Sequence, residues 1–466
     1  MAVIRYNGDT RLILFGVRLR GSSVVAPLST LDELILHYVR ALVALPSVTG
    51  DDPALEQAAP TIADILRGLG FQVNVHPTEG APIILAHRPG KSAQRLLFFN
   101  HYDVMPAGVW RDWFHEPFTL AEREGLLYGR GVANDKGNLA ARIAAVAQIL
   151  AETGDLPVGV TFLIEGDGLS GSPSLANLVA DQANHLTADL VVGYGGMLDQ
   201  ARLPYLYAGV RGRLLVRLRA EGAKIPIGAD MATSVPNPAW RILWAVNRIK
   251  NDSEEVTIDG FYDAVVPPSR EANKLTRGLQ LDEETRLKAW GMPQFLFGMT
   301  GAGLARAETF NPTCNVAGLT VDTGHSPPPT IPASAEVLLD FSLVPEQRPT
   351  EVARLLREHL NSADFHDVHL EIIKGAYPPA MNALSTPLLN SLATAIEQVY
   401  GSTPQIVPLA PFSVPLHLFT AGMNVPAVAL GIQRPDSNVR VINEHIQLAD
   451  LKAMASLIQQ LIIGLG

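Results

Sequence analysis

Apolar positions in the first half of the chain switch repeatedly between helical and strand-like spacing. The helical stretches, with apolar residues three or four positions apart, are 31–45, 55–69 and 137–151. The strand-like runs are 71–75, 83–87, 95–100, 158–164 and 190–192. The run at 95–100 contains Leu-Leu-Phe-Phe without a polar break, which is typical of a strand buried on both faces. Strands that alternate with helices in this way predict a doubly wound α/β layer.

The pattern changes near residue 212. Residues 214–219 alternate apolar with polar side chains, as a half-exposed antiparallel strand does, and 336–343 is again strand-like. Helical stretches at 237–247 and 350–360 accompany these two strands. The combination predicts a small α+β domain inserted into the α/β domain.

The α/β pattern resumes near residue 378. It continues with a helix at 388–400, a strand at 425–430 and a last helix at 449–465. The predicted domains are an N-terminal extension at 1–27, an α/β domain formed by 28–212 with 378–466, and an inserted α+β domain at 213–377.

Charge and cysteine content limit the partners. The net charge is −10 and no block of Lys or Arg occurs, which argues against nucleic acid or an anionic membrane surface. Cys314 is the only cysteine, so neither an internal disulfide nor a thiolate metal cluster can form, and a reducing cytoplasm is the expected location. Because Arg18 and Arg20 interrupt the first apolar stretch and no run of about 18 apolar residues occurs, we expect neither an export signal nor a membrane span.

His101-Tyr102-Asp103 follows directly after the buried strand that ends at Asn100. Ligands in open α/β sheets bind beyond the carboxyl ends of strands. In His-x-Asp at such a place the imidazole can bind a metal while the carboxylate orients the ring. Taken alone, a histidine after a strand is more often an ordinary loop or core histidine than a metal ligand.

Residues 128–137, Tyr-Gly-Arg-Gly-Val-Ala-Asn-Asp-Lys-Gly, open the helix at 137–151. The strand with His-x-Asp-Val-x-Pro, followed by Gly-Arg-Gly-x-x-x-x-Lys-Gly, resembles the zinc peptidase family of aminoacylases, carnosinases, succinyl-diaminopimelate desuccinylases and carboxypeptidase G. Shorter matches in the same order are Leu-Pro-Ser-Val at 45–48, Gly-Val-Arg-Gly at 209–212, Val-Pro-Asn-Pro at 235–238, Asn-Pro-Thr at 311–313, Leu-Val-Pro-Glu-Gln at 343–347 and Asn-Glu at 443–444. The resemblance extends from about residue 31 to the C-terminus.

The resemblance implies a two-metal site and a known domain arrangement. Two zinc ions would share a bridging Asp and a water, each with one His and one further carboxylate, while a Glu acts as general base. The inserted domain of the family pairs with its copy, so a homodimer is expected.

Carrying the family positions onto this chain leaves little of that site. His101 matches the first zinc-binding His and Asp103 its orienting carboxylate, but the bridging Asp falls on Asn134. The general base falls on Gly168. The remaining metal-ligand positions are Leu169, Tyr194 and Arg440. The substrate-binding positions of the family fall on Ile227, Ser342, Leu409 and Phe412.

Three hypotheses follow from these replacements. The first is a pseudoenzyme that needs no cofactor, in which Arg440 pairs with Asp103 in place of the lost metal charge. The second is a zinc-dependent hydrolase of dipeptides or N-acyl amino acids, with an altered site at His101, Asn134, Asp135 and Asp167. The third is a small-molecule or protein-binding module that uses the interdomain cleft.

Overall fold

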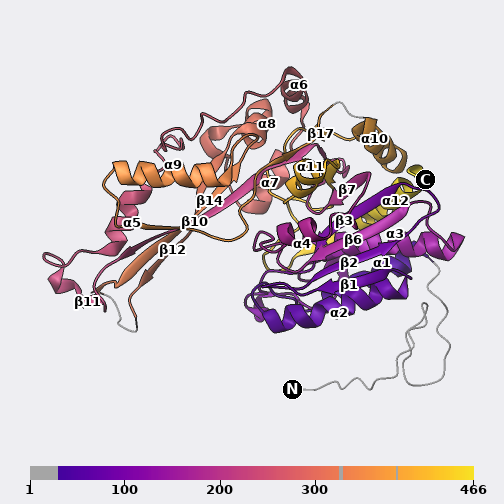
Figure 1. The fold of residues 1–466 in the computed structure, drawn as a ribbon, viewed down its shortest axis with the longest axis horizontal. Helices are drawn as coiled ribbons and strands as arrows, with labels where there is room; N and C mark the ends of the chain where they lie inside the picture. Colours follow the sequence, from indigo (N-terminus) through magenta and orange to yellow (C-terminus); the bar gives the residue numbers. More distant parts are fainter. Residues whose placement is uncertain (1–29, 325–328, 385–386) are drawn as a thin grey trace. The chain divides into compact units, whose positions relative to one another are not determined.

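The computed structural model describes residues 30–324, 329–384 and 387–466 (Figure 1). The chain divides into two compact units: unit 1 comprises Met1–Gly166 and Ser437–Gly466, and unit 2 comprises Asp167–Asp436. The predicted inserted domain, 213–377, falls wholly within unit 2, and the proposed domain boundaries stay a prediction. The predicted extension at 1–27 lies outside the described residues.

Four strands of unit 1 form the sheet layer that positions His101. In spatial order they are β1 (Gln72–His76), β2 (Ile83–Arg88), β6 (Gly159–Glu165) and β3 (Arg95–His101). β3 and β6 are parallel, whereas β2 is antiparallel to both of its neighbours. All of β6 and all of β3 after its first residue are buried, as the uninterrupted apolar runs predict.

Helices cover this layer (Figure 1). α1 (Leu31–Val43), α3 (Lys136–Thr153) and α12 (Leu448–Gly464) pack against one another, and α2 (Asp52–Gly68) packs on β1 and β2. α1 begins with a capping box, in which Thr30 accepts a hydrogen bond from the amide of Glu33 and Glu33 accepts one from the amide of Thr30. A small sheet of β19 (His445–Gln447), β5 (Leu126–Tyr128) and β4 (Ala121–Arg123) completes unit 1.

Unit 2 contains strands and helices of the α/β type and a separate antiparallel sheet. The first group has strands in the order β7 (Leu190–Gly193), β18 (Ala427–Ala429), β8 (Leu206–Tyr207) and β17 (Ile406–Val407). Its helices are α4 (Leu175–Asp181), α10 (Pro387–Tyr400) and α11 (His417–Met423). β7 and β18 run parallel, which agrees with the predicted return of the α/β pattern near the C-terminus.

The antiparallel sheet has four strands, in the order β12 (Thr313–Asp322), β14 (Ser334–Leu343), β10 (Gly212–Glu221) and β15 (His369–Ile372). α5 (Pro238–Val246) and α9 (Pro349–Ser362) pack on it. The two strands predicted from the sequence are β10 and β14, whereas β12 and β15 were not predicted. β15 has just four residues, and a register shift between Val316 and Gly318 interrupts the alternation in β12, so neither strand shows a clear period of two.

The stretch between α5 and β12 forms α6 (Arg270–Gly278), α7 (Glu283–Trp290) and α8 (Gly301–Phe310), of which α6 and α8 pack together. Among the described helices, none is both long and apolar enough to cross a membrane. The predicted fold class, a mixed α/β fold with several sheets, is confirmed.

Candidate functional site

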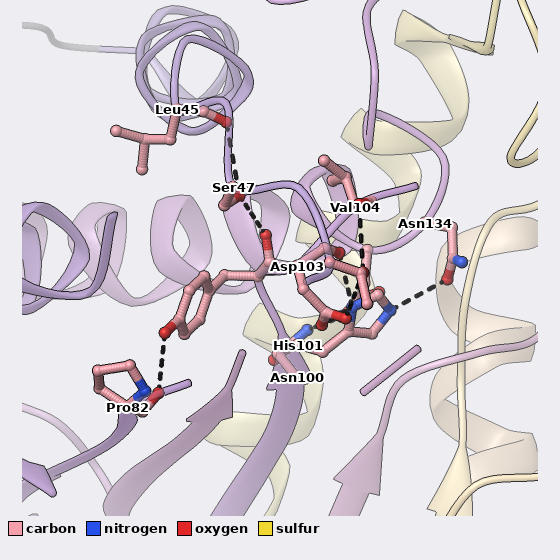
Figure 2. A network of polar contacts seen from close by, with 11 residues as sticks. Leu45, Ser47, Pro82, Asn100, His101, Asp103, Val104 and Asn134 are labelled. Carbon is pink, nitrogen blue, oxygen red and sulfur yellow. Dashed lines mark hydrogen bonds and ion pairs between the residues drawn. The ribbon is translucent and has the colours of Figure 1, made fainter. Parts of the chain in front are cut away.

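His101 is the last residue of β3 and is almost fully buried. Its Nδ1 lies 3.0 Å from Asp103 Oδ1, and its Nε2 lies 3.3 Å from Asn134 Oδ1 (Figure 2). The structure therefore brings together three residues that the sequence singled out. Both ring nitrogens of His101 have a partner, one carboxylate and one neutral amide.

The loop after β3 is fixed from the opposite side. Thr49 Oγ1 donates to Asp103 Oδ2 at 3.0 Å, and Ser47 Oγ donates to the Tyr102 carbonyl at 2.6 Å. The Tyr102 hydroxyl donates to the Pro82 carbonyl at 2.9 Å, and this contact is also visible in Figure 2. These bonds hold Asp103 against the imidazole, in the orienting position expected for it.

The charge balance at His101 favours the imidazolium. Burial disfavours the charged form, but the carboxylates of Asp103, Asp135 and Glu165 outweigh burial and raise the pKa of His101 to about 9. At neutral pH, Nδ1 then donates to Asp103 and Nε2 donates to the carbonyl oxygen of Asn134.

A buried ion pair holds the segment that carries Asn134. Glu444 Oε1 accepts the backbone amides of Ala133 and Asn134 at 3.0 and 3.1 Å, and Glu444 Oε2 accepts Arg130 Nη1 at 2.8 Å. Gly131 in this segment has a φ of +88°, and a Cβ there would lie 2.6 Å from the Val104 side chain, so only glycine fits. These residues lie in the motifs that resemble the family, but the motifs alone did not indicate that they contact one another.

Asp135 is occupied by neighbouring side chains. Its carboxylate accepts Asn100 Nδ2 at 2.5 Å and Asn138 Nδ2 at 2.7 Å, and Asn100 Oδ1 in turn accepts Arg142 Nη1 at 2.8 Å. Burial raises the pKa of Asp135, although His101 and Arg142 oppose this. Asn100, Asn138 and Arg142 were missed from the sequence because their partners come together only through the packing of α3 beside β3.

Arg440 does not replace the metal charge beside Asp103. It is exposed, its φ is 67°, and within the described part of the chain it forms no ion pair. Asp103 is instead bonded to His101 and Thr49. The expected pairing of Arg440 with Asp103 was wrong, because the imidazolium and a hydroxyl already satisfy this carboxylate.

The other predicted metal and base positions belong to unit 2. Gly168 and Leu169 lie in a turn after β6 and are half-buried, and Tyr194 follows β7 and is buried. Asp167, a ligand in the second hypothesis, is half-buried, and its backbone carbonyl accepts the amides of Ser170 and Ser172.

The predicted substrate-binding positions also lie in unit 2. Ile227 belongs to β11 (Ile227–Gly228), which pairs with β13 (Thr330–Ile331). Ser342 accepts a hydrogen bond from Arg211 Nη1 at 3.4 Å. Leu409 is buried, and the ring of Phe412 packs edge-on against Tyr207 at 5.0 Å between centroids.

These residues do not fit a dinuclear zinc centre. Zinc takes imidazole, thiolate and carboxylate ligands, whereas the ligand positions here hold one imidazole, one amide, a leucine, a tyrosine and an arginine. The amide of Asn134 carries no negative charge with which to bridge two cations. Among the described residues, no group of three or more His, Cys, Asp or Glu side chains is arranged to hold a metal ion.

Comparisons with known proteins agree with the motifs. One curated relative is the Beta-Ala-His dipeptidase of Rattus norvegicus, which is 27% identical over 370 residues; the match covers 74% of each chain. Another is the Cysteinylglycine-S-conjugate dipeptidase of Corynebacterium striatum, which is 25% identical over 448 residues; this match covers 91% of this chain and 92% of the relative. A similar solved structure is the M20 family metallo-carboxypeptidase Sso-CP2 from Sulfolobus solfataricus, with a TM-score of 0.85, 28% identity, and 92% and 98% of the two chains covered.

The sequence profile described as Peptidase family M20/M25/M40 matches residues 97–464, which is well over half of the chain. The resemblance inferred from the motifs is thereby confirmed. This chain belongs to the peptidase family M20/M25/M40.

Proposed function

We propose that this protein is a non-catalytic member of its family, a pseudoenzyme that holds no zinc. The observation that carries the proposal is Asn134, which occupies the bridging position and directs its amide oxygen to His101 Nε2 at 3.3 Å. In a two-metal hydrolase the bridging carboxylate offsets the charge of both ions. A neutral amide cannot do so, and no general base remains at Gly168.

Support also comes from the contrast between the retained frame and the replaced ligands. The buried Arg130–Glu444 pair, Gly131 and the His101–Asp103 pair all lie in the sequence motifs that resemble the family. Four metal-ligand positions and the base position carry other residue types. This combination retains the fold while removing the chemistry.

Metal content tests the proposal directly. We expect the protein, purified without chelator and dialysed against zinc, to hold less than roughly a tenth of an equivalent by elemental analysis. The same preparation should hydrolyse neither β-Ala-His nor Cys-Gly, the dipeptides in the names of its relatives. An M20 dipeptidase carried through the same dialysis and assays is the positive control.

A tightly held equivalent of zinc that is lost on His101→Ala would overturn the proposal. In that case the second hypothesis, an active hydrolase with an altered metal site, would replace it. Against that alternative, both oxygens of Asp135 already accept amide hydrogens from Asn100 and Asn138. The single cysteine, Cys314, is unpaired and buried, which supports the cytoplasm as the location that we propose.

We also propose that the protein is a homodimer through the four-stranded sheet of unit 2. β12 is an edge strand with no charged residue before Asp322. Its register with β14 places Val316, Leu319 and Val321 opposite buried residues of β14, on the face that α5 covers elsewhere. These three side chains are about half exposed.

The exposed side of α5 extends this apolar area. Trp240, Leu243 and Trp244 are spaced three and four residues apart and so form one stripe, in which the two indoles stack with centroids 6.0 Å apart. Unpaired, uncharged edge strands are normally protected from solvent or from other strands. A second copy, with its own β12 antiparallel to this one, supplies both the missing strand and an apolar helix.

A further inference from the structure

Two loops of unit 1 expose large apolar side chains. One loop follows β3 and contains the 3-10 helix η1 (Trp110–Asp112), and the other joins Ser437 to Glu444. Their exposed apolar residues, named here the aromatic face, are Met105, Val109, Trp110, Phe114, Val441 and Ile442. Trp110 is 56% exposed and Phe114 is 67% exposed, which is unusual for the two largest side chains of the group.

The two loops are joined to each other. The backbone amide of Phe114 donates to Asn443 Oδ1 at 2.8 Å, next to Ile442 in the chain. The Phe114 ring packs edge-on against Tyr128, which in turn packs on His445 at 5.1 Å between centroids. The two loops therefore lie against each other at Phe114 and Asn443, which brings their exposed apolar side chains to the same side of unit 1.

A single buried guanidinium fixes both loops from below. Arg130 Nη2 donates to the Pro106 carbonyl at 3.2 Å, and its guanidinium lies 5.0 Å from the ring of the buried Trp113. The same Arg130 is ion-paired with Glu444, the residue after Asn443. A surface held in this way loses little conformational entropy when a partner binds.

The second loop presents a cation beside the apolar side chains. Asn438, Arg440 and Asn443 all have left-handed backbone conformations, which an arginine rarely adopts because the conformation costs about 1–2 kcal/mol. The Arg440 side chain is exposed and, within the described residues, has no carboxylate partner. Residues 438–443 contain no Asp or Glu, so Arg440 is a local positive charge on a protein whose net charge is −10.

We propose that the aromatic face and Arg440 form a docking site for an acidic, apolar peptide segment of a partner protein. A carboxylate of the segment pairs with Arg440, while its aromatic or aliphatic side chains pack on Trp110 and Phe114. The two rings alone expose on the order of 250 Å² of apolar surface, enough to anchor a short peptide. The inference rests on the proposed non-catalytic role and gives that role a binding chemistry.

The test is selection from a phage-displayed library of random peptides of about 12 residues, followed by fluorescence anisotropy with one labelled selected peptide. We expect the selected sequences to combine Asp or Glu with aromatic or aliphatic residues. Arg440→Glu and Trp110→Ser/Phe114→Ser should each weaken binding of the labelled peptide by about tenfold or more. Arg123→Glu, which changes the same charge at an exposed site on β4, should leave binding unchanged.

Replacing the acidic residues of the peptide with Lys should abolish binding, and each protein variant should melt within a few degrees of the wild type. Failure to select peptides, selection of sequences without carboxylates, or unchanged binding by Arg440→Glu would overturn the inference. So would sedimentation with phosphatidylserine vesicles that is lost in Trp110→Ser/Phe114→Ser, since a membrane would then be the partner. Zinc content measured on the same preparation separates the outcomes: bound zinc refutes the non-catalytic role, whereas failed selection refutes only the docking site.

Discussion

At the scale of single residues, the proposed absence of zinc depends on the chemistry of a few side chains around His101. Asn134 has the size and direction of an aspartate, yet it meets His101 with a neutral oxygen. Asp103 needs no new cation because the imidazolium and Thr49 satisfy it. A buried carboxylate with such partners needs no metal ion to balance its charge, so the fold is compatible with the absence of zinc that we propose.

The Arg130–Glu444 pair should carry much of the local stability. Both side chains are nearly fully buried, so Arg130→Met leaves an unpaired buried carboxylate. We expect this variant to lower the free energy of unfolding by about 3–5 kcal/mol in urea titrations. Arg354→Met, which breaks exposed pairs with Glu351 and Glu358 on α9, should change the free energy of unfolding far less, because water and salt screen exposed ion pairs. Equal costs for the two variants would contradict the role given to burial.

His417 should make stability depend on pH. Burial lowers the pKa of His417 to about 4, and its ring stacks on Tyr377 with an interplanar angle of 10°. In the unfolded chain this histidine binds a proton near pH 6.5, whereas in the folded chain it stays neutral until the pH is close to 4. The stability that neutral His417 contributes is therefore complete above pH 6.5 and is lost as the pH falls towards 4. The loss should approach about 1.4 kcal/mol per pH unit.

The measurement is chemical unfolding at pH 7, 5.5 and 4.5. His417→Phe keeps a ring against Tyr377 and should flatten the decline between these values. His366→Gln, which alters a side chain that is 67% exposed, should follow the wild-type profile. An identical decline in wild type and His417→Phe would assign the pH dependence to other groups.

At the scale of elements, the sequence predicted long, periodic segments well and short or interrupted ones poorly. The helix predicted at 137–151 is α3, and the strand predicted at 95–100 is β3. β12 and β15 were missed, because strand recognition depends on a regular alternation that a bulge or a four-residue length removes. Asn134 could be identified from the motif alone, whereas its bond to His101 depends on the packing of α3 against the sheet.

Alanine in place of Gly137 in α3 and of Gly68 in α2 should have different effects on the stability of the protein. Alanine normally stabilises a helix by up to about 1 kcal/mol relative to glycine. A Cβ at Gly137, in the first turn of α3, would lie 2.1 Å from the Val132 carbonyl oxygen, whereas a Cβ at Gly68, at the end of α2, meets nothing within 4 Å. We therefore expect Gly137→Ala to destabilise by about 1–3 kcal/mol or more, and Gly68→Ala to be neutral or stabilising.

Thermal unfolding of the two variants beside the wild type measures the difference. A Gly137→Ala protein as stable as Gly68→Ala would mean that the segment before α3 moves freely. The bonds from Glu444 to the amides of Ala133 and Asn134 argue against such movement.

At the scale of the whole molecule, the fold class could be predicted from the sequence because it depends on patterns that recur along the chain. The class follows from periodicities that are local in the chain, and the last helix predicted from them is α12, which belongs to unit 1 together with the N-terminal α/β elements. Composition shows the net charge and the lone cysteine, yet it could not show that β12 lies at the edge of its sheet with exposed apolar side chains. That feature requires the register of β12 on β14.

The exposed edge strand β12 leads to the prediction of a homodimer. Light scattering coupled to size exclusion should give about twice the chain mass of 50.1 kDa at micromolar concentration. A stable interface usually buries roughly 800 Å² on each partner, and the two tryptophans of α5 with the three apolar residues of β12 supply most of such an area. Leu319→Lys combined with Trp244→Lys buries two unpaired charges in that interface and should yield a monomer.

Val266→Lys adds a charge at another exposed apolar residue of unit 2 and should remain dimeric. A monomeric wild type would refute the proposed homodimer through β12. If all three proteins are dimeric, the copies meet elsewhere. The interface is assigned if Leu319→Lys/Trp244→Lys is monomeric while the wild type and Val266→Lys are dimeric. Lysine is tolerated on a free surface but not in the core of an interface.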